Sequence, residues 1–312
     1  MYDILIVGGG PAGLTAAVYG RRANRSVLVI EKETFGGQIT FSPMVENIPG
    51  FTALSGNAFA EKLVDQAVSQ GAEFESDTVT GIEAVSADGV PAFVAHGESG
   101  DYEGRTVVIA SGARHRMLGL PGEDAYVGNG ISFCAVCDGA FYRDQTVGVV
   151  GGGNSALQEA VLLSELVRKL YIFQDLPVLT GEKKLQEILA SRGNVEVITG
   201  VHVTGLLGTA DADGGAAELS GVTLTHADGR TEDVALSGLF VAIGLVPQNE
   251  PFQNLFALNA WGYADADESC RTRTPGVFVA GDCRSKRVRQ VATAAADGAV
   301  AALAACDFLD GK

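Results

Sequence analysis

Two stretches in which an apolar run leads into a glycine-rich turn and then into a helical pattern predict an α/β protein with two Rossmann-like domains. The first stretch covers residues 2–23 and the second covers residues 146–166. A strand, a glycine turn and a helix in this order form the start of a dinucleotide-binding unit. The length of 312 residues and the apolar content of 46% are sufficient for two domains, each with its own core.

Charge and cysteine content narrow the functional class. The chain has 38 acidic and 22 basic side chains and a net charge of −16, which opposes binding to nucleic acid or to anionic lipid. No stretch approaches about 18 uncharged apolar residues, so we expect no membrane span. Five cysteines are too few, and odd in number, for the disulfide framework of a secreted protein. We therefore expect a cytoplasmic protein in a reducing compartment.

The first glycine turn spans residues 8–13, between an apolar run at 2–7 and a helical pattern at 14–23. Its glycines let the backbone approach a pyrophosphate at the helix N-terminus, where free N–H groups favour anions. The next predicted strand, 26–30, ends at Glu31, whose carboxylate can accept hydrogen bonds from a ribose. Because strand, turn, helix and acid all lie where a dinucleotide fold needs them, we favour a nucleotide site over a glycine turn without function.

The segment that follows is predicted to contain a ligand-wrapping loop, a helix and a small antiparallel layer. The loop consists of Gly36-Gly37-Gln38 and residues 45–51, and it is too long and too rich in glycine and proline for a simple connection. An amphipathic helix is predicted at 56–70. Further predictions are strands at 79–94, broken at 88–89, and at 105–109, a small-residue strand end at 110–113 and an interdomain link at 114–121.

Residues 133–139 read FCAVCDG. Two cysteines separated by two residues predict either a redox dithiol or half of a metal site. A zinc site needs a second pair of ligands, but the other three cysteines are scattered singly and no histidine lies at ligand spacing from another. Asp138 directly follows the second cysteine and can exchange a proton with a thiolate. We therefore favour a redox dithiol of Cys134 and Cys137 without metal, and two ordinary buried cysteines are the remaining alternative.

The second glycine turn, at 151–156, follows a strand pattern at 146–150 and precedes a helical pattern. The next predicted strand, 169–173, ends at Gln174-Asp175. An NADPH site has arginine or lysine at this place for the 2′-phosphate, and an NADH site has a carboxylate for the ribose. Gln174 is neither basic nor acidic, and Asp175, one residue later, is the only nearby side chain that fits either pattern. We favour the interpretation that this turn is retained to pack a helix on a strand.

The C-terminal half supplies the remaining strands and the last helix. A strand at 275–282 ends in Gly281-Asp282, and an acid at such a strand end can hold a sugar-chain hydroxyl of a cofactor. Arg289 precedes a long alanine-rich helix at 290–308, whose N-terminus favours anions. The other predicted elements are hairpin strands at 195–207 and 221–225, a turn at 210–217 and a buried strand at 239–245.

The two glycine motifs, the CxxC-Asp sequence between them and the Gly-Asp strand end resemble the low-molecular-weight thioredoxin reductases over essentially the whole chain. The resemblance implies that the second domain is inserted in the first. An FAD-binding domain would then consist of residues 1–113 and 245–312, and a central domain of residues 114–244 would carry the CxxC motif. FAD contacts are implied at Gly8, Gly10, Ala12, Gly13, Glu31, Gly37, Gln38, Asn47, Asp282, Arg289, Gln290 and Val291.

The same resemblance implies roles for the dithiol and for partners. It implies a homodimer that reduces thioredoxin or a similar protein disulfide. Cys137 would face the flavin, Cys134 would attack the disulfide of thioredoxin, and Asp138 would shuttle the proton.

The sequence departs from the NADPH-dependent members of that family in one place. Those members have a His-Arg-Arg cluster and a further arginine, whereas residues 174–181 read QDLPVLTG. The departure resembles the ferredoxin-dependent flavin thioredoxin reductases, which keep the fold and the dithiol but use no pyridine nucleotide. We therefore expect ferredoxin as the electron donor. The alternatives are NADH bound through Asp175, NADPH, and a flavin protein that senses redox state without turnover.

Two further predictions concern residues outside these motifs. The three single cysteines, Cys270, Cys283 and Cys306, are predicted to be structural thiols, because none has a second cysteine at short spacing. A cluster of basic residues near the Gly-Asp strand end is predicted to dock an acidic electron donor, and solvated surface with Arg289 on the FAD phosphates is the alternative. The cluster consists of Arg271, Arg273, Arg284, Lys286, Arg287 and Arg289.

Overall fold

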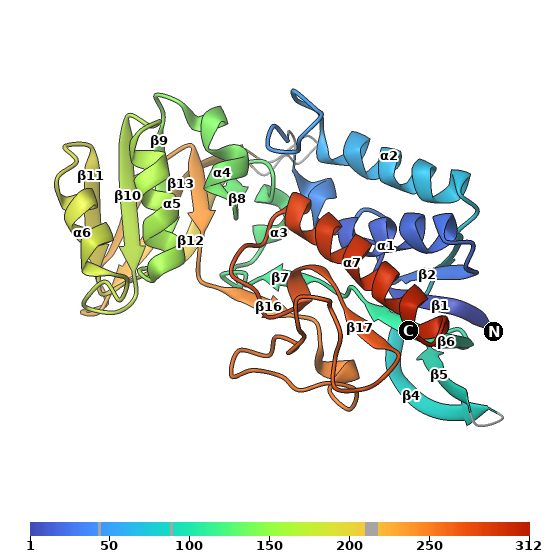
Figure 1. The fold of residues 1–312 in the computed structure, drawn as a ribbon. Coiled ribbons are helices and arrows are strands. Elements are labelled where there is room, and N and C mark those ends of the chain that lie inside the picture. Colours follow the sequence, from blue (N-terminus) through green and yellow to red (C-terminus); the bar gives the residue numbers. More distant parts are fainter. Residues whose placement is uncertain (43–44, 88–89, 210–217) are drawn as a thin grey trace. The chain divides into compact units, whose positions relative to one another are not determined.

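The computed structural model describes residues 1–312 except 43–44, 88–89 and 210–217. The predicted strand break at 88–89 and the predicted turn at 210–217 therefore lie outside the described residues. The chain divides into two compact units, and the second is inserted in the first (Figure 1). Each boundary differs by one residue from the boundary predicted for the two domains. Unit 1 consists of Met1–Arg114 and Val246–Lys312, and unit 2 consists of His115–Leu245.

The sheet of unit 1 is built around the first predicted strand. β1 (Tyr2–Val7) pairs in parallel with β2 (Val27–Glu31) on one side and with β6 (Asp101–Ile109) on the other. β1 and β2 are apolar over most of their length, as expected for parallel strands covered on both faces. The strand order is β3-β2-β1-β6-β5-β4, with β17 also paired to β6; the remaining bounds are Glu73–Ser76 (β3), Val79–Ala87 (β4), Val90–Gly97 (β5) and Val277–Val279 (β17).

The strands that were predicted to form a small antiparallel layer belong to this same sheet. β5 pairs with the first half of β6, where Phe93 lies opposite Gly104, and β4 pairs with β5. The last residues of β6, from Val107 to Ile109, pair instead with β17. The predicted antiparallel pairing is confirmed, and the layer is continuous with the parallel sheet because β6, with nine residues, is long enough to hold two partners along one edge.

Alternate residues of β1 are buried on opposite faces of the sheet. Ile4 and Ile6 belong to a core that includes residues of α1 (Pro11–Arg22), α7 (Val291–Leu309) and α2 (Gly56–Ser69). Leu5 and Val7 belong to a second core, which includes residues of β4, β5 and the segment 252–264. Both faces of the sheet are therefore covered within unit 1.

α7 is long and apolar enough, by length and composition, to cross a membrane, and it is the one such helix in the described part of the chain. Asp297 and Asp307 interrupt its apolar run, so α7 does not contain the long run of uncharged apolar residues that the sequence analysis required for a membrane span. Its alanines, among them Ala301 and Ala305, are buried in the core of unit 1. A side chain at Gly298 would overlap the backbone of Ala12 in α1. We interpret α7 as a core helix.

Unit 2 contains a five-stranded parallel sheet in the order β11-β10-β9-β15-β8. Val147 and Val149 of β9 pack under the helices on one face, and Phe173 and Leu239 pack against an antiparallel sheet on the other. The bounds are Glu123–Tyr126 (α3), Ile131–Ser132 (β8), Ala135–Asp138 (α4), Thr146–Val150 (β9), Asn154–Ser164 (α5), Lys169–Gln174 (β10), Lys183–Ala190 (α6), Val195–Thr199 (β11), Val201–Thr209 (β12), Glu218–His226 (β13), Thr231–Ala235 (β14) and Gly238–Val241 (β15).

The predicted strand at 195–207 is two strands that belong to different sheets. β11 pairs in parallel with β10, whereas β12 starts the antiparallel pairing with β13. Gly200, with a φ of 66°, separates the two strands. Glycine adopts this left-handed conformation at little cost, so the chain changes direction there. The prediction of one strand was wrong because alternation of apolar and polar residues continues across the glycine.

Candidate functional site

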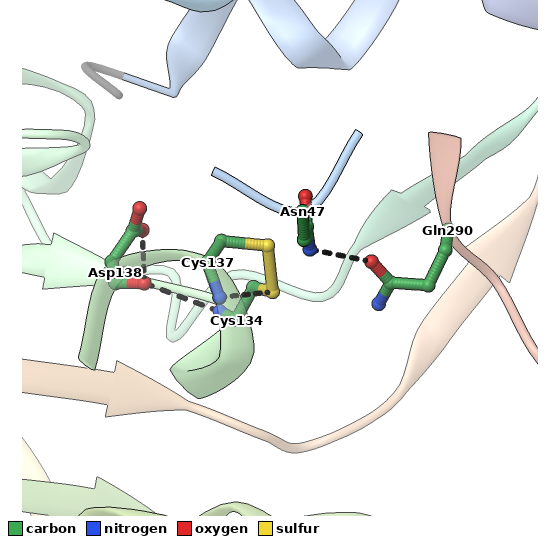
Figure 2. Close-up of a disulfide and its surroundings, with 6 residues drawn as sticks. Asn47, Cys134, Cys137, Asp138 and Gln290 are labelled. Atoms are coloured by element: carbon green, nitrogen blue, oxygen red, sulfur yellow. Dashed lines mark hydrogen bonds between the residues drawn. A yellow bond between two sulfur atoms is a disulfide. The ribbon is translucent and has the colours of Figure 1, made fainter. Parts of the chain in front are cut away.

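The two cysteines of the CxxC motif form a disulfide. Cys134 and Cys137 have Cα atoms 5.3 Å apart, and Cys134 caps the N-terminus of the short helix α4 (Figure 2). The Cys137 N–H donates to Cys134 Sγ at 3.2 Å. Both cysteines are partly exposed, and the intervening Val136 is 60% exposed. The short helix therefore places the disulfide next to an exposed side chain and leaves both cysteines partly accessible to solvent.

Asp138 is the last residue of α4, and its carboxyl group is largely buried. Its Oδ2 accepts a hydrogen bond of 2.6 Å from Ser132 Oγ, whereas its Oδ1 is buried without a hydrogen-bond partner among the described residues. Burial raises the pKa of Asp138, although the bond from Ser132 opposes the rise. A carboxyl group with a raised pKa is suited to give a proton to a departing thiolate.

Ser132 was not identified from the sequence. It is 5% exposed, and besides its bond to Asp138 its Oγ accepts the Cys134 N–H at 3.2 Å. The Ser132 hydroxyl therefore links the backbone of Cys134 to the carboxyl group of Asp138. The sequence carries no signal for this role, because serine at the end of a short strand is common in proteins that have no such site.

The first glycine turn has the geometry of an anion site. Gly8 has a φ of 110°, which a residue with a Cβ rarely adopts. Gly10 is the N-cap of α1 and makes no side-chain capping bond, and Pro11 occupies the first turn, where its missing N–H is of no consequence. The free N–H groups of this helix end are oriented to bind a pyrophosphate.

Glu31 lies at the end of β2, next to this turn. Its Oε2 accepts the Gly9 N–H at 2.6 Å, and its Oε1 accepts the Glu33 N–H at 2.9 Å. Burial raises its pKa, with the Gly9 bond opposing. A carboxylate oxygen can accept a second bond, so the fixed carboxylate can also hold ribose hydroxyls.

The other predicted cofactor contacts in unit 1 lie around the same turn. Gly37 packs on Gly10, so a Cβ on Gly37 would lie 3.1 Å from the Gly10 Cα. Gly281 packs on Ala12 and so brings Asp282 to the start of α1. Asp282 Oδ1 is buried and has no hydrogen-bond partner among the described residues. Burial raises the pKa of Asp282, with the charges of Lys286 and Arg289 opposing. This orphaned buried oxygen fits a cofactor hydroxyl that would donate to it.

The remaining members of the predicted set also contact one another or the core of unit 1. Gln38 donates to the Ala113 carbonyl, and Asn47 Nδ2 donates to Gln290 Oε1 at 3.2 Å (Figure 2). Gln290 caps α7, and Val291 packs on a small apolar cluster beneath residues 45–59. Because these contacts tie the loop to the N-terminus of α7, the residues present fit FAD.

The second glycine turn differs at the corresponding place. Gly152 packs against the Gln174 side chain, as Gly9 packs against Glu31 in the first turn. Gln174 is 4% exposed, and its Nε2 donates to the Val178 carbonyl at 3.4 Å. An uncharged amide thus occupies the position that a carboxylate fills in the first fold. The following residues, 175–178, are exposed and include one charge, that of Asp175.

A family model described as pyridine nucleotide-disulphide oxidoreductase matches residues 2–298. The chain belongs to this family. Thioredoxin reductase from Bacillus subtilis (strain 168) is 36% identical over 302 residues, which cover 97% of this chain and 93% of that protein. The "34.2 kDa protein in rubredoxin operon" of Clostridium pasteurianum is 37% identical over 311 residues, which cover 99% of this chain and 98% of that protein.

Solved structures agree with this assignment. The crystal structure of thioredoxin reductase from Streptococcus pyogenes MGAS5005 superposes with a TM-score of 0.89 at 36% identity, and the match covers 100% of this chain and 99% of that chain. The protein is therefore an FAD-dependent disulfide oxidoreductase of the low-molecular-weight thioredoxin reductase type. An enzyme of this family has turnover, so the alternative of a flavin sensor without turnover is set aside.

The three cysteines outside the motif are all buried in this oxidoreductase. Cys283 Sγ lies 3.3 Å from the Ala280 carbonyl, and Cys270 Sγ lies 3.6 Å from the Asp297 carbonyl. Burial raises the pKa of each thiol, to about 12 for Cys270. Since the thiolate is the reactive form, this geometry favours structural roles for them.

The predicted basic docking cluster is not an exposed patch. Arg284 and Lys286 each pair with the buried Asp297 at 3.0 Å, and the Lys286 side chain is 9% exposed. Arg289 lies over the Tyr263 ring at 3.9 Å. The prediction was wrong for Arg284 and Lys286 because a buried carboxylate requires positive partners, which the charge pattern of the sequence does not show. Arg271, Arg273 and Arg287 remain exposed.

Proposed function

We propose that this oxidoreductase reduces thioredoxin or a thioredoxin-like protein with electrons from a one-electron carrier such as ferredoxin, and not from a pyridine nucleotide. The observation that supports this proposal is the difference between the residues around the two glycine turns. Both turns lead into a helix whose N-cap glycine has no side-chain capping bond, but only the first turn has a carboxylate at the end of the next strand, that of Glu31, and the orphaned Asp282 oxygen lies near it. The second has a buried amide at Gln174.

An NADPH site would need positive charge where β10 ends. The 2′-phosphate is bound by arginine or lysine, and a bidentate arginine bond to phosphate is among the strongest polar contacts. The exposed segment 175–178 instead presents Asp175 together with Leu176 and Val178, whose exposed fractions are 46% and 61%. A phosphate placed there would meet a negative charge and two apolar side chains.

The dithiol supplies the chemistry of the proposed reaction. The thiolate of Cys134 attacks a sulfur of the partner disulfide, and Cys137 then attacks Cys134 and releases the reduced partner. Two electrons and two protons leave the enzyme in each turnover. Asp138 is the proposed proton carrier, because its carboxyl group is linked through the Ser132 hydroxyl to the backbone of Cys134 and keeps one buried oxygen without a partner among the described residues. FAD, when bound, accepts electrons from the donor and passes two of them to the Cys134–Cys137 disulfide.

The C. pasteurianum relative supports a one-electron donor, because that protein is named for its place in a rubredoxin operon. NADH is the second candidate donor, since the exposed carboxylate of Asp175 can accept hydrogen bonds from a ribose. Stopped-flow reduction of the flavin in the absence of oxygen separates the three donors. We expect NADPH and NADH to bleach the flavin far more slowly than reduced ferredoxin does, and faster bleaching by NADH would favour the second candidate.

A double variant, Asp175→Arg with Leu176→Arg, is expected to gain NADPH reactivity. Both side chains are exposed, so the fold should tolerate the change. One charge-assisted contact to the 2′-phosphate contributes about 1.5–3 kcal/mol, so flavin reduction at low NADPH concentration should accelerate about tenfold or more. NADH lacks this phosphate and is the matched control. An equal gain with NADH, or no gain with NADPH, would contradict the explanation based on missing arginines.

Two further proposals follow from the family resemblance and from composition. We propose a homodimer, which sedimentation would refute if the mass were that of one chain. We also propose a cytoplasmic location, on the basis of the odd cysteine count and the acidic charge. Cell fractionation that places the protein outside the cytoplasm would refute it.

A further inference from the structure

A buried carboxylate lies within the last helix of unit 1, α7, which packs against β17 and the residues that follow it (Figure 1). This carboxylate, that of Asp297, is 8% exposed, and Ala294, Ala301 and Ala305 on the same helix belong to the core. A carboxylate removed from water is costly unless charged or polar partners compensate. In the described part of the chain, the groups that donate to its oxygens all come from one short segment, residues 281–286.

Four hydrogen bonds join this segment to the carboxylate. The Gly281 N–H donates to Asp297 Oδ2 at 3.1 Å, and Lys286 Nζ donates to the same oxygen at 3.0 Å. Arg284 donates to both oxygens, from Nη2 to Oδ1 at 3.0 Å and from Nε to Oδ2 at 3.2 Å. A bidentate, charge-assisted contact of this kind holds the guanidinium in one orientation. Asp297 therefore fixes the start, the middle and the end of the segment.

The segment that Asp297 fixes carries Asp282, the residue that fits a cofactor hydroxyl. Gly281 precedes it with a φ of 81°, and a Cβ on Gly281 would lie 2.8 Å from the Cβ of Ala12 in α1. The hydrogen bond from Gly281 to Asp297 therefore sets the place of the residue before Asp282. Lys286 Nζ, which Asp297 also holds, lies 3.9 Å from Asp282 Oδ1, the buried oxygen without a hydrogen-bond partner among the described residues.

The same segment supports Arg289, which lies just before the N-cap of α7. Arg289 Nε donates to the Asp282 carbonyl at 3.3 Å, and its Nη2 donates to the Arg284 carbonyl at 3.4 Å. Its guanidinium lies over the ring of Tyr263, 3.9 Å from the centroid. Asp282 and Arg289, both of which are expected to contact the cofactor, therefore depend on one segment, and Asp297 ties this segment to α7.

We propose that Asp297 is a positioning residue for FAD, and that its carboxylate holds residues 281–286 in the arrangement that presents Asp282 to a hydroxyl of the cofactor. Asp297 acts through Gly281, Arg284 and Lys286, not by contact with FAD. The proposal depends on FAD as the cofactor of the family, and not on the electron donor or the protein substrate. When a binding segment is in its competent arrangement for only part of the time, the apparent affinity for the ligand falls by that fraction.

Asp297→Asn tests the proposal, because asparagine has nearly the same shape but no charge to pair with Arg284 and Lys286. The full chain is freed of FAD, and FAD binding is followed by the quenching of flavin fluorescence. We expect the dissociation constant for FAD to rise at least about tenfold, since hydrogen bonds between charged groups are strong polar contacts. We also expect a smaller increase in melting temperature when FAD is added, because ligand stabilisation follows affinity.

Asp307→Asn is the matched control. Asp307 is an exposed residue of the same helix, so this variant removes the same charge from the surface of α7. Its dissociation constant for FAD should stay within about twofold of wild type. A similarly unchanged FAD affinity in Asp297→Asn would overturn the proposal. So would an equal fall in melting temperature with and without FAD in Asp297→Asn, because that result indicates a role in stability alone.

Hydrogen exchange of the wild-type protein keeps the proposal testable even if Asp297→Asn does not fold. Because the Gly281 N–H donates to Asp297 and not to the cofactor, this amide should be protected in the FAD-free protein, as measured by residue-resolved mass spectrometry. In a folded Asp297→Asn its exchange should accelerate at least about tenfold, whereas exchange in β1 should not change. Fast exchange of this amide in FAD-free wild type, slowed only when FAD is added, would overturn the proposal, because the cofactor and not Asp297 would then order the segment.

Discussion

Replacing either cysteine of the disulfide with serine is expected to lower the rate of thioredoxin reduction by about a thousandfold or more, because a serine hydroxyl can neither form nor exchange a disulfide. Dithionite should still bleach the flavin in both variants. The two variants should differ in one respect. Cys137→Ser retains the attacking Cys134 thiol and should accumulate a mixed disulfide with thioredoxin, whereas Cys134→Ser should not.

The buried single cysteines provide the matched control. Cys283→Ser and Cys306→Ser should leave the rate of thioredoxin reduction within about twofold of wild type, since both thiols are buried and unreactive. Mass spectrometry under non-reducing conditions detects the mixed disulfide. Substantial thioredoxin reduction by Cys134→Ser, or its loss in Cys283→Ser, would refute the assignment of the dithiol.

Replacing Gly13 with alanine is expected to disrupt unit 1. A Cβ at this position would overlap the Gly8 carbonyl oxygen and would lie 3.2 Å from Ile6 Cγ2, so α1 must move away from β1. Overpacking of this kind destabilises by about 1–3 kcal/mol or more. We expect a lower melting temperature and loss of FAD together, measured by calorimetry and by the ratio of flavin to protein absorbance.

Replacing Gly10 with alanine is expected to weaken FAD binding without lowering the stability of the protein. A Cβ on Gly10 would lie 3.9 Å from the nearest other backbone atom, the Gly36 carbonyl oxygen, so Gly10→Ala should leave the apoprotein as stable as wild type. It should nevertheless weaken FAD binding, because the methyl group would occupy space where the pyrophosphate approaches the backbone. Equal FAD affinity for Gly10→Ala and wild type would place the cofactor elsewhere.

The features that were predicted correctly from the sequence are those marked by short motifs. The glycine turns and the CxxC pair were predictable because few conformations suit Gly-x-Gly beside a strand, and few chemistries suit two cysteines at that spacing. Glu31 could be identified for the same reason, since its place is fixed by the end of β2. These features depend on neighbours within a single strand–turn–helix unit.

Features that depend on packing between distant segments could not be predicted. β5 and β17, the two strands that pair along one edge of β6, are more than 170 residues apart in the chain. From the sequence, the basic residues near Asp282 appeared to have no acidic partner. Asp297, which pairs with two of them, lies later in the chain, within α7.

The most direct test of the proposed electron path is thiol formation in thioredoxin under anaerobic conditions with each donor in turn. Reduced ferredoxin, NADPH and NADH are supplied at equal electron equivalents, and free thiols are counted after quenching. With ferredoxin we expect two thiols for every two electrons supplied, because one disulfide takes up one electron pair. With either nucleotide we expect almost none. Brisk thiol formation with NADPH, and none with ferredoxin, would contradict the account.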